Sequence, residues 1–418
     1  MKHAADIFFD LQDISYPWIA ALDKHGQGLV QVSTKEMIGR KLWVWGTGRG
    51  GRNWQRLLSP PGNGYIEIQA GLTRTQLEYM RLSPVTSCSW LEALGYLDAD
   101  SKIVHGTDWQ GACVHVENEL QRIVPEKALI DEHQRCNEFV DRAPEEYFLK
   151  GSGWGALESK RQSVQHEKGL YCGGLEFGDE TISKAQQPWS ALLETGRFPE
   201  VDVNFPGSTF VSQEWEQIIQ AALMSQDREN WFAWYQAGIV RYQAGNFPGA
   251  EIAWKKSLES CWTPWATRNL GVLAWHDNQI NLAADLLVDA FLGASDVLPL
   301  AVECGKCLIE AVRHEEWLEI VKKLPKSMKS NGRIRFLEAQ ASLTSGNLDN
   351  AERFFIDNVV LDDLREGDNS ISDLWREIQL QKKLEEEDIP PDHPQIDKYR
   401  KLLSLPEEID FRLNEKNH

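Results

Sequence analysis

The sequence lacks long hydrophobic runs and has few cysteines. No stretch of its 418 residues approaches the ~18 consecutive apolar residues that a membrane-spanning helix requires. The first residues also lack the apolar core of a secretory signal. The seven cysteines are scattered and odd in number, which is typical of unpaired thiols in a reducing compartment. We therefore expect a cytoplasmic protein that does not cross a membrane.

Basic residues are too few to balance the acidic ones. The chain has 44 Lys and Arg against 63 Asp and Glu, a formal net charge of −19. Nucleic acids and anionic membrane surfaces would repel such a chain, so we expect neither as a partner. Cofactor signatures are also scarce. Cys304 and Cys307 form a Cys-x-x-Cys pair with no second cysteine or histidine pair nearby, and we expect neither a metal nor an organic cofactor.

Small residues recur with even spacing through the second half of the chain. Gly238, Gly271, Gly305 and Ala339 are separated by 33, 34 and 34 residues. Gly245, Asn278 and Gly346 follow seven residues later, Ala250, Ala283 and Ala351 twelve residues later, and Trp254, Leu287 and Phe355 sixteen residues later. A period near 34 with this placement predicts tetratricopeptide repeats, in which each antiparallel helix pair buries its apolar face against its neighbours.

The repeats divide the chain into four expected parts. We predict the repeat array over 211–365, followed by capping helices and a tail over 366–418. A helical and irregular connector is expected over 108–210, with short helices near 154–161 and 189–193. The remaining part, 1–107, is expected to be a β domain.

The β domain is indicated by short apolar stretches that are separated by turns and not by amphipathic helices. The expected strands are 18–22, 28–32, 41–45, 65–69 and 89–93. Strands that follow one another in this way favour an antiparallel sheet over a plan of alternating strands and helices. The expected fold class is therefore a multidomain chain in which antiparallel β structure precedes an α-helical solenoid.

A Gly-x-Gly-x-x-Gly motif follows one of these strands, at Gly46, Gly48 and Gly51. A dinucleotide site of this type needs a following helix and a second parallel strand. The sequence offers barely two helical turns before Pro60 and no second parallel strand. We therefore interpret the motif as a flexible loop at the mouth of the sheet.

Polar and aromatic residues are denser around this loop than a protein core needs. Tryptophan can stack on the face of a sugar ring, and carboxylate and amide groups bind sugar hydroxyls in pairs. Glu67 and Gln69 lie two residues apart on one predicted strand, so their side chains share a face. We predict a sugar site around Glu67 that is completed by Trp45, Arg52, Trp54, Gln69 and Gln76. The alternative is that these residues form the polar, solvent-facing side of a sheet.

The chain resembles bacterial tetratricopeptide-repeat proteins with a galactose-mutarotase-like N-terminal domain of unknown function. The stretches that carry this resemblance are Pro17 to Ala20, Gly39 to Gly46, Gly51 to Gln55, Tyr65 to Gly71, Thr75 to Glu78 and Ile409 to Arg412. The resemblance implies a mutarotase-like antiparallel β supersandwich in the first part of the chain. That part is shorter than a complete supersandwich, so we expect it to lack the upstream part of the domain. The first strands would then expose an unpaired edge.

The same resemblance implies a role for Glu67. In mutarotases, a Glu-x-Gln pair on a late strand supplies the base that removes the anomeric hydroxyl proton, and Glu67 and Gln69 fit that pair. The mutarotase motif continues with Pro-Asp, whereas Ala70 and Gly71 follow here. The mutarotase acid is a histidine far upstream of the glutamate, and only His3 and His25 precede Glu67.

Two hypotheses about function follow. In the first, the protein is carbohydrate-active or carbohydrate-binding, with its sugar site near Glu67 and the repeats as a scaffold. In the second, it is a non-catalytic interaction protein whose repeats bind a peptide or protein partner. For that partner the first helices of the repeats would form a groove in which Arg241, Arg268 and Asn269 could bind a peptide carboxylate. Whether the protein is an enzyme stays open at this point.

Overall fold

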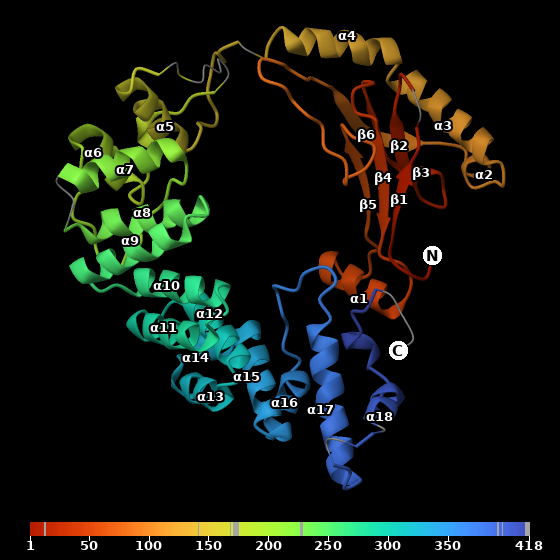
Figure 1. Ribbon diagram of the computed structural model, residues 1–418. Coiled ribbons are helices and arrows are strands. Elements are labelled where there is room, and N and C mark those ends of the chain that lie inside the picture. The colour runs from red at the N-terminus through yellow and green to blue at the C-terminus, as the bar shows by residue number, and fades with distance from the viewer. Residues whose placement is uncertain are drawn as a thin grey trace. The chain divides into compact units, whose positions relative to one another are not determined.

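The computed structural model describes residues 1–11, 14–140, 142–167, 169, 175–225, 229–390, 393–394 and 396–413 (Figure 1). The chain forms two compact units. The first unit comprises Met1–Ala143, Glu366–Asp373 and Ser404–His418, and the second comprises Pro144–Arg365 and Leu374–Leu403. The end of the chain therefore belongs to the same compact unit as its beginning.

The first unit contains two antiparallel sheets of three strands each. The strands are β1 (Ala5–Phe9), β2 (Trp18–Leu22), β3 (Gln27–Ser33), β4 (Gly39–Val44), β5 (Ile66–Gly71) and β6 (Glu92–Asp98). One sheet has the order β1-β4-β5 and the other β2-β3-β6. The predicted antiparallel β structure is confirmed. Strand β1 was not predicted, and β6 begins three residues after the start expected at residue 89.

Helices cover one face of the sheet β2-β3-β6. Strand β3 alternates, so that Val30 and Val32 point to one side, where they pack with Leu97 of β6 in a single core. Val116 and Leu120 of α3 (Trp109–Ile123) complete this core. Two further helices belong to this part of the chain, α2 (Ser101–Val104) and α4 (Glu126–Asn137). The period of two in the strand and the helical spacing of α3 place all these side chains between the two layers.

The predicted flexible loop after β4 is in fact a helix. Helix α1 spans Arg49–Leu58 and begins directly after Gly48. A Cβ atom on Gly50 would lie 2.0 Å from the carbonyl oxygen of Arg412, and one on Gly51 would lie 2.1 Å from that of Trp45. These glycines allow backbones to approach closely. Since β4 pairs with β5 in an antiparallel manner, the motif does not open a unit of two parallel strands and a helix.

The second unit is helical. It begins with α5 (Gly153–Val164), η1 (Asp179–Thr181), α6 (Gln187–Thr195) and α7 (Gln213–Ser225). The repeats follow as α8 (Trp231–Gln243), α9 (Phe247–Ser260), α10 (Pro264–His276), α11 (Ile280–Gly293), α12 (Leu298–Glu310), α13 (His314–Lys323), α14 (Lys326–Lys329), α15 (Gly332–Thr344) and α16 (Leu348–Ile356). Then come α17 (Ser370–Glu386), whose residues 370–373 belong to the first unit, and α18 (Ile396–Leu402), while η2 (Glu407–Ile409) of the tail belongs to the first unit. The helices expected near 154–161 and 189–193 are present as α5 and α6.

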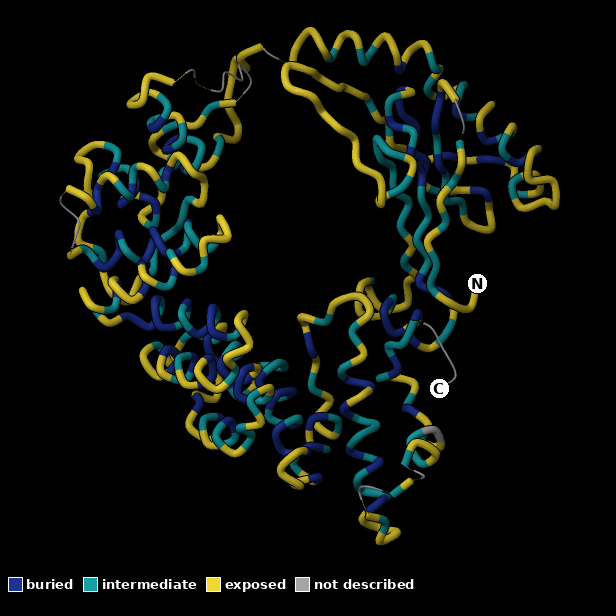
Figure 2. Tube along the Cα trace, in the orientation of Figure 1, coloured by how far each residue is buried: buried dark blue, intermediate teal, exposed yellow. Residues whose placement is uncertain are grey.

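The predicted repeat spacing corresponds to four successive helix pairs. The first helices are α8, α10, α12 and α15, and the second helices are α9, α11, α13 and α16. Buried residues follow the sides on which the two helices of a pair meet (Figure 2). Gly245, Asn278 and Gly346, predicted to end the first helices, have φ angles of 78°, 57° and 75°. This left-handed backbone is typical of residues that follow a helix.

The third repeat departs from the pattern at two positions. Val312 takes the place of the turn glycine and adopts a φ of 60°, which is an uncommon conformation for a β-branched residue. Trp317 takes the place of the small residue in the second helix and is fully buried. Its ring packs on Gly305, where an added Cβ would lie 2.7 Å from it. In the first repeat the Trp254 ring packs on Gly238 in the same way, but from four residues further along its helix.

Candidate functional site

The predicted sugar-site residues fall into two separate groups in the first unit. Strand register brings the first group together on one face of the sheet β1-β4-β5. Asp6 and Glu67 both lie opposite Trp43, from the two neighbouring strands. Phe8 and Gln69 flank Lys41 in the next row of that face. Aromatic, acidic, amide and ammonium groups therefore share one surface.

Lys41 lies at the centre of this first group. Its Nζ is 2.5 Å from Oδ1 of Asp6 and donates a hydrogen bond of 2.8 Å to Oε1 of Gln76. The same ammonium group lies 5.7 Å from the ring centroid of Phe8 and 5.8 Å from that of Trp43, within the range of cation–π attraction. Gln76 comes from the segment after β5, so Lys41 ties that segment to the sheet. We call Asp6, Lys41, Trp43, Glu67, Gln69 and Gln76 the sheet-face cluster.

Glu67 binds its neighbour in this cluster. Gln69 donates a hydrogen bond of 2.6 Å from Nε2 to Oε2 of Glu67. A third carboxyl group, that of Glu366, lies close enough to the cluster to feel its charges. Partial burial raises the pKa of Glu366, and the negative charges of Glu67 and Asp6 raise this pKa further. The pKa of the Tyr65 hydroxyl is raised by desolvation and by Glu67. The cluster thus combines hydroxyl-binding groups with aromatic rings, and it concentrates negative charge around one lysine.

The second group, Trp45, Trp54 and Arg52, is engaged elsewhere. Trp45 and Trp54 are 3% and 1% exposed, and their rings stack with centroids 5.6 Å apart. Trp54 donates its indole N–H to the carbonyl oxygen of Phe411 at 2.9 Å. Arg52 forms an ion pair of 2.6 Å with Glu407. Arg52 and Trp54 therefore hold the end of the chain, whereas the ring of Trp45 meets that of Trp43 in the sheet-face cluster edge-on, with centroids 5.2 Å apart.

The tail segment Glu407–Arg412 docks on helix α1. Asn53, which is 2% exposed, donates from Nδ2 to the carbonyl oxygens of Glu407 and Asp410 at 2.5 and 3.0 Å. Burial tends to raise the pKa of the Asp410 carboxyl, but its hydrogen bonds with Arg412 outweigh burial and hold this pKa below its ordinary value. Buried amide, indole and carboxylate groups therefore all find partners in this contact.

A second candidate surface lies on the first helices of the repeats. Tyr242, Trp275 and Ile309 stand 33 and 34 residues apart, at the same position in α8, α10 and α12. One turn earlier, Ile239, Val272 and Lys306 occupy another shared position. All but Lys306, which is exposed, are partly buried and partly open to solvent. Residues three apart are neighbours on a helix, so each of the three helices contributes one pair of adjacent side chains, and we call these six residues together the first-helix face.

The residues predicted to bind a peptide carboxylate already have partners within the chain. Arg241 donates to Gln220 at 2.7 Å and pairs with Glu216. Arg268 donates two hydrogen bonds to the carboxylate of Glu303 on α12. These hydrogen bonds raise the pKa of the Arg268 guanidinium. Asn269 is 7% exposed and accepts a hydrogen bond from Arg268. All three residues therefore have partners within the chain, and their binding of a peptide carboxylate stays a prediction.

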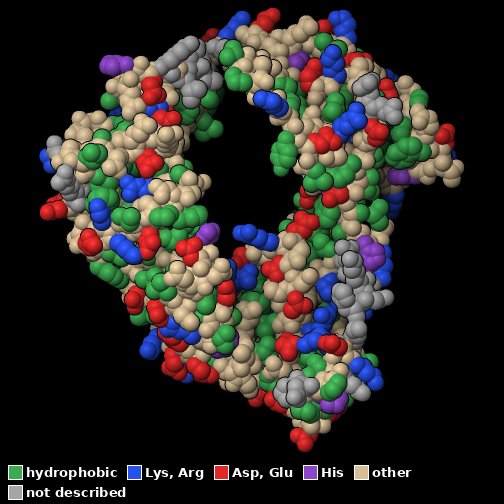
Figure 3. Space-filling view, viewed as in Figure 1, with side chains coloured by type: hydrophobic (Ala, Val, Ile, Leu, Met, Phe, Trp, Pro, Cys, Tyr) green, Lys and Arg blue, Asp and Glu red, His purple; other side chains and the backbone are tan. Residues whose placement is uncertain are grey.

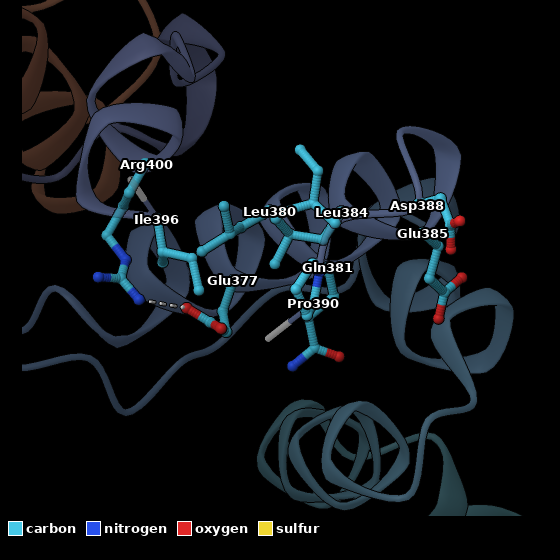
Figure 4. A pocket seen from close by; sticks show the side chains of 10 residues that line it. Glu377, Leu380, Gln381, Leu384, Glu385, Asp388, Pro390, Ile396 and Arg400 are labelled. Carbon is cyan, nitrogen blue, oxygen red and sulfur yellow. Dashed lines mark hydrogen bonds and ion pairs between the residues drawn. The ribbon is translucent and has the colours of Figure 1, made fainter. Parts of the chain in front are cut away.

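A pocket of about 550 Å³ lies between α17 and α18 in the second unit (Figure 4). Leu380 and Leu384 form its apolar floor, and Arg400 at one end pairs with Glu377 at 3.5 Å. Glu385 and Asp388 lie at the other end (Figure 4). Its charged groups are thus either paired or acidic, Gln381 adds an amide, and none of its lining residues is a buried, unsatisfied hydrogen-bonding group.

The remaining reactive groups do not form a site. Cys304 and Cys307 are buried in the repeat core, where burial raises their pKa values to about 12 and about 11. The described residues contain no group of His, Cys, Asp and Glu arranged to hold a metal ion.

None of the described helices combines the length and the apolar composition that crossing a membrane requires. Acidic and basic side chains are interspersed over the visible surface (Figure 3).

Comparisons with known proteins place the two units in context. A family described as a domain of unknown function, DUF5107, matches residues 17–102. The crystal structure of a TPR-domain-containing protein from Parabacteroides distasonis is similar over 100% of this chain, with a TM-score of 0.53 and 13% identity. The chain spans 61% of the length of that structure. The crystal structure of yeast Tom70 matches over 71% of this chain and over 64% of the Tom70 chain, with a TM-score of 0.25 and 13% identity. No curated protein is significantly similar.

These comparisons confirm the predicted architecture. A DUF5107 domain precedes a TPR-like helical array, and the chain combines β and α structure in that order. At this level of identity the likeness to solved structures concerns the fold alone. The matched segment 17–102 covers strands β2 to β6 and helix α1, and most of the sheet-face cluster falls within it.

Proposed function

We propose that the protein is an interaction scaffold that binds a partner polypeptide on the first-helix face of its repeat array. The observation that carries this proposal is the repetition of large, partly open side chains at equivalent positions of α8, α10 and α12. Aromatic residues are enriched in protein interfaces because they bury much area at a low entropic cost. Arrays of stacked repeats also offer the long continuous surfaces that extended partners need.

The electrostatics of this face suit a polypeptide of mixed polarity. Arg268 and Glu303 neutralise one another across α10 and α12, and Trp275 donates its indole N–H to Glu310 at 3.1 Å. Lys306 is exposed on α12, the last of the three helices of the face, where its ammonium group can pair with a carboxylate of a partner. The apolar residues of the face would supply most of the affinity, while Lys306 and Glu310 would select the orientation of the partner.

A selection from a random peptide library tests the proposal. Peptides selected on the whole protein should lose about 30-fold in affinity on Trp275→Ala, since a central aromatic contact in an interface typically contributes about 2 kcal/mol. Fluorescence anisotropy with labelled peptides measures the change. Ile252→Ala is the matched control, because Ile252 is 54% exposed on the second helix α9. Equal affinity of the selected peptides for wild type and Trp275→Ala would contradict the proposal.

A second candidate function is carbohydrate binding on the sheet-face cluster. It is favoured by the convergence of Glu67, Gln69 and Gln76 beside the ring of Trp43 and the ammonium group of Lys41. Carboxylate and amide groups that lie next to an aromatic ring are what a sugar ring with several hydroxyls requires.

Calorimetry against a panel of mono- and oligosaccharides tests this second function. A sugar that binds wild type should lose its affinity on Glu67→Gln if the carboxylate holds a hydroxyl. It should keep its affinity and lose turnover if Glu67 is a base. Glu119→Gln on α3 serves as a control far from the cluster in sequence. If no sugar of the panel binds the wild-type protein, the carbohydrate function is excluded.

A further inference from the structure

The connector between α6 and α7 is held firmly at both of its ends, although it forms neither helix nor strand. At one end, the ring of Phe198 packs edge-on against Trp189, with centroids 5.2 Å apart. At the other end, Phe210 stacks on Trp215 with centroids 3.9 Å apart and meets Trp154 edge-on at 4.3 Å. These two aromatic anchors fix where the intervening residues can lie.

Between the anchors, the chain runs along the first helices of the first two repeats. Trp265 of α10 donates its indole N–H to the carbonyl oxygen of Val203 at 2.8 Å. Gln236 of α8 donates from Nε2 to the carbonyl oxygen of Ser208 at 3.1 Å and accepts a hydrogen bond from Thr209 at 2.8 Å. Gln236 is fully buried. Helix side chains thus bind the backbone of this segment as a groove binds an extended peptide.

A turn in the segment fits closely against α8. Gly207 adopts a φ of 68°, in the left-handed region where glycine is favoured. A Cβ atom at this position would lie 2.9 Å from the ring of Phe232. By contrast, Val203 and Phe205 remain 38% and 42% exposed. The segment is therefore held through its backbone and its turn, while its two large apolar side chains contribute little burial.

The segment lies at one end of the surface to which the proposed function is assigned. Gln236 precedes Ile239 by three residues on α8, and Trp265 precedes Val272 by two turns on α10. The anchoring side chains therefore continue the first-helix face toward the N-termini of the same helices. A partner peptide that extended along this face would reach the carbonyl-binding groups that residues 203–209 now use.

We propose that residues 202–209 are a built-in peptide ligand that closes one end of the first-helix face, and that partner segments of the same chemistry compete with it. This inference rests on the proposed function. The chemistry is that of Asp-Val-Asn-Phe-Pro-Gly-Ser-Thr: a segment outside helices and strands, with one negative charge at Asp202 and a Pro-Gly turn, whose carbonyl groups bind Gln236 and Trp265. Because the built-in ligand is tethered, its effective concentration is on the order of millimolar, and it masks the site from weak competitors.

Two variants release the segment in different ways. In the first, residues 202–209 are replaced by eight Gly and Ser residues with Gly at position 209, so that the Pro-Gly turn and the Thr209 hydroxyl are lost while both aromatic anchors are kept. In the second, Gly207→Val places a β-branched side chain in a left-handed turn against Phe232, which disturbs only the turn. Circular dichroism shows which of the two variants keep the helix content of the wild-type protein, and only those are used. The probe is a labelled synthetic peptide of residues 201–210, and fluorescence anisotropy measures its binding.

The folded released variants should bind the probe at least ~10-fold more tightly than wild type, because the tethered competitor is gone. Adding Gln236→Leu to a released variant should abolish that gain. On the wild-type protein, millimolar probe should accelerate hydrogen exchange in residues 203–209, a measurement that needs no variant. Equal affinity for wild type and released variants, or unchanged exchange, would overturn the inference. If library peptides still depended on Trp275 in that case, the proposed function would stand and only the built-in ligand would be rejected.

Discussion

Trp317→Ala should lower the free energy of unfolding of the repeat array by about 3–5 kcal/mol. The side chain is fully buried, and its ring fills the space above Gly305 in the third repeat. Cys304 and Leu308 of α12 belong to the same buried core, and both are themselves fully buried. Since a stacked array transmits stability between neighbouring repeats, a cavity in the third repeat should weaken the repeats on both sides.

Urea unfolding followed by circular dichroism measures this effect. Ile252→Ala is the control, because Ile252 is 54% exposed on α9, and it should change the free energy of unfolding by less than about 1 kcal/mol. A Trp317→Ala protein that unfolds at the same urea concentration as wild type would show that the third repeat is packed differently from this account.

Trp54→Ala should destabilise the first unit by a similar amount, about 3–5 kcal/mol. The ring is 1% exposed between Trp45 and Phe411, and its N–H binds the tail. The substitution therefore removes both a large buried ring and the anchor of the segment Glu407–Arg412. A chain that ends at Leu403 should show the same loss, because Asn53 and Trp54 would be left without their carbonyl acceptors.

Differential scanning calorimetry can separate the transition of the first unit from that of the repeats. Trp54→Phe is the control for the ring: it keeps most of the packing but removes the donor, and it should cost about 1–3 kcal/mol. If the chain that ends at Leu403 melts like wild type, the tail is not part of the folded first unit.

The two groups of predicted sugar-site residues show what a sequence can reveal about a site. Glu67 and Gln69 were placed on one face by the period of two in a strand, and the structure brings Gln76 to them through Lys41. Arg52 and Trp54 were grouped with them because they are near in sequence. Their true partners, Glu407 and Phe411, lie more than 350 residues away, and no local pattern indicates such a contact.

The repeats were predictable because their signal is local and recurs. Gly245, Asn278 and Gly346 mark turns that each need a left-handed residue, and three of four repeats show that preference. The third repeat was predicted from Gly305 alone, because Val312 replaces the turn glycine and Trp317 places the aromatic ring one helical turn earlier than in the first repeat. Gln236, Asn269 and Glu303 share one position in successive first helices. Polar residues that recur at a buried or partly buried position of the first helices were the signal that could have identified Gln236 as a binding group.

Site-specific photocrosslinking in the cells that naturally express the protein tests the central claim most directly. A benzoylphenylalanine residue placed at position 272, on the first-helix face, should crosslink a distinct partner polypeptide. The same residue at position 252, on the exposed side of α9, should not. The yield at position 272 should fall on Trp275→Ala, which removes the neighbouring ring. Equal crosslinking at both positions, or a partner captured only at position 252, would contradict the assignment of the partner to the first-helix face.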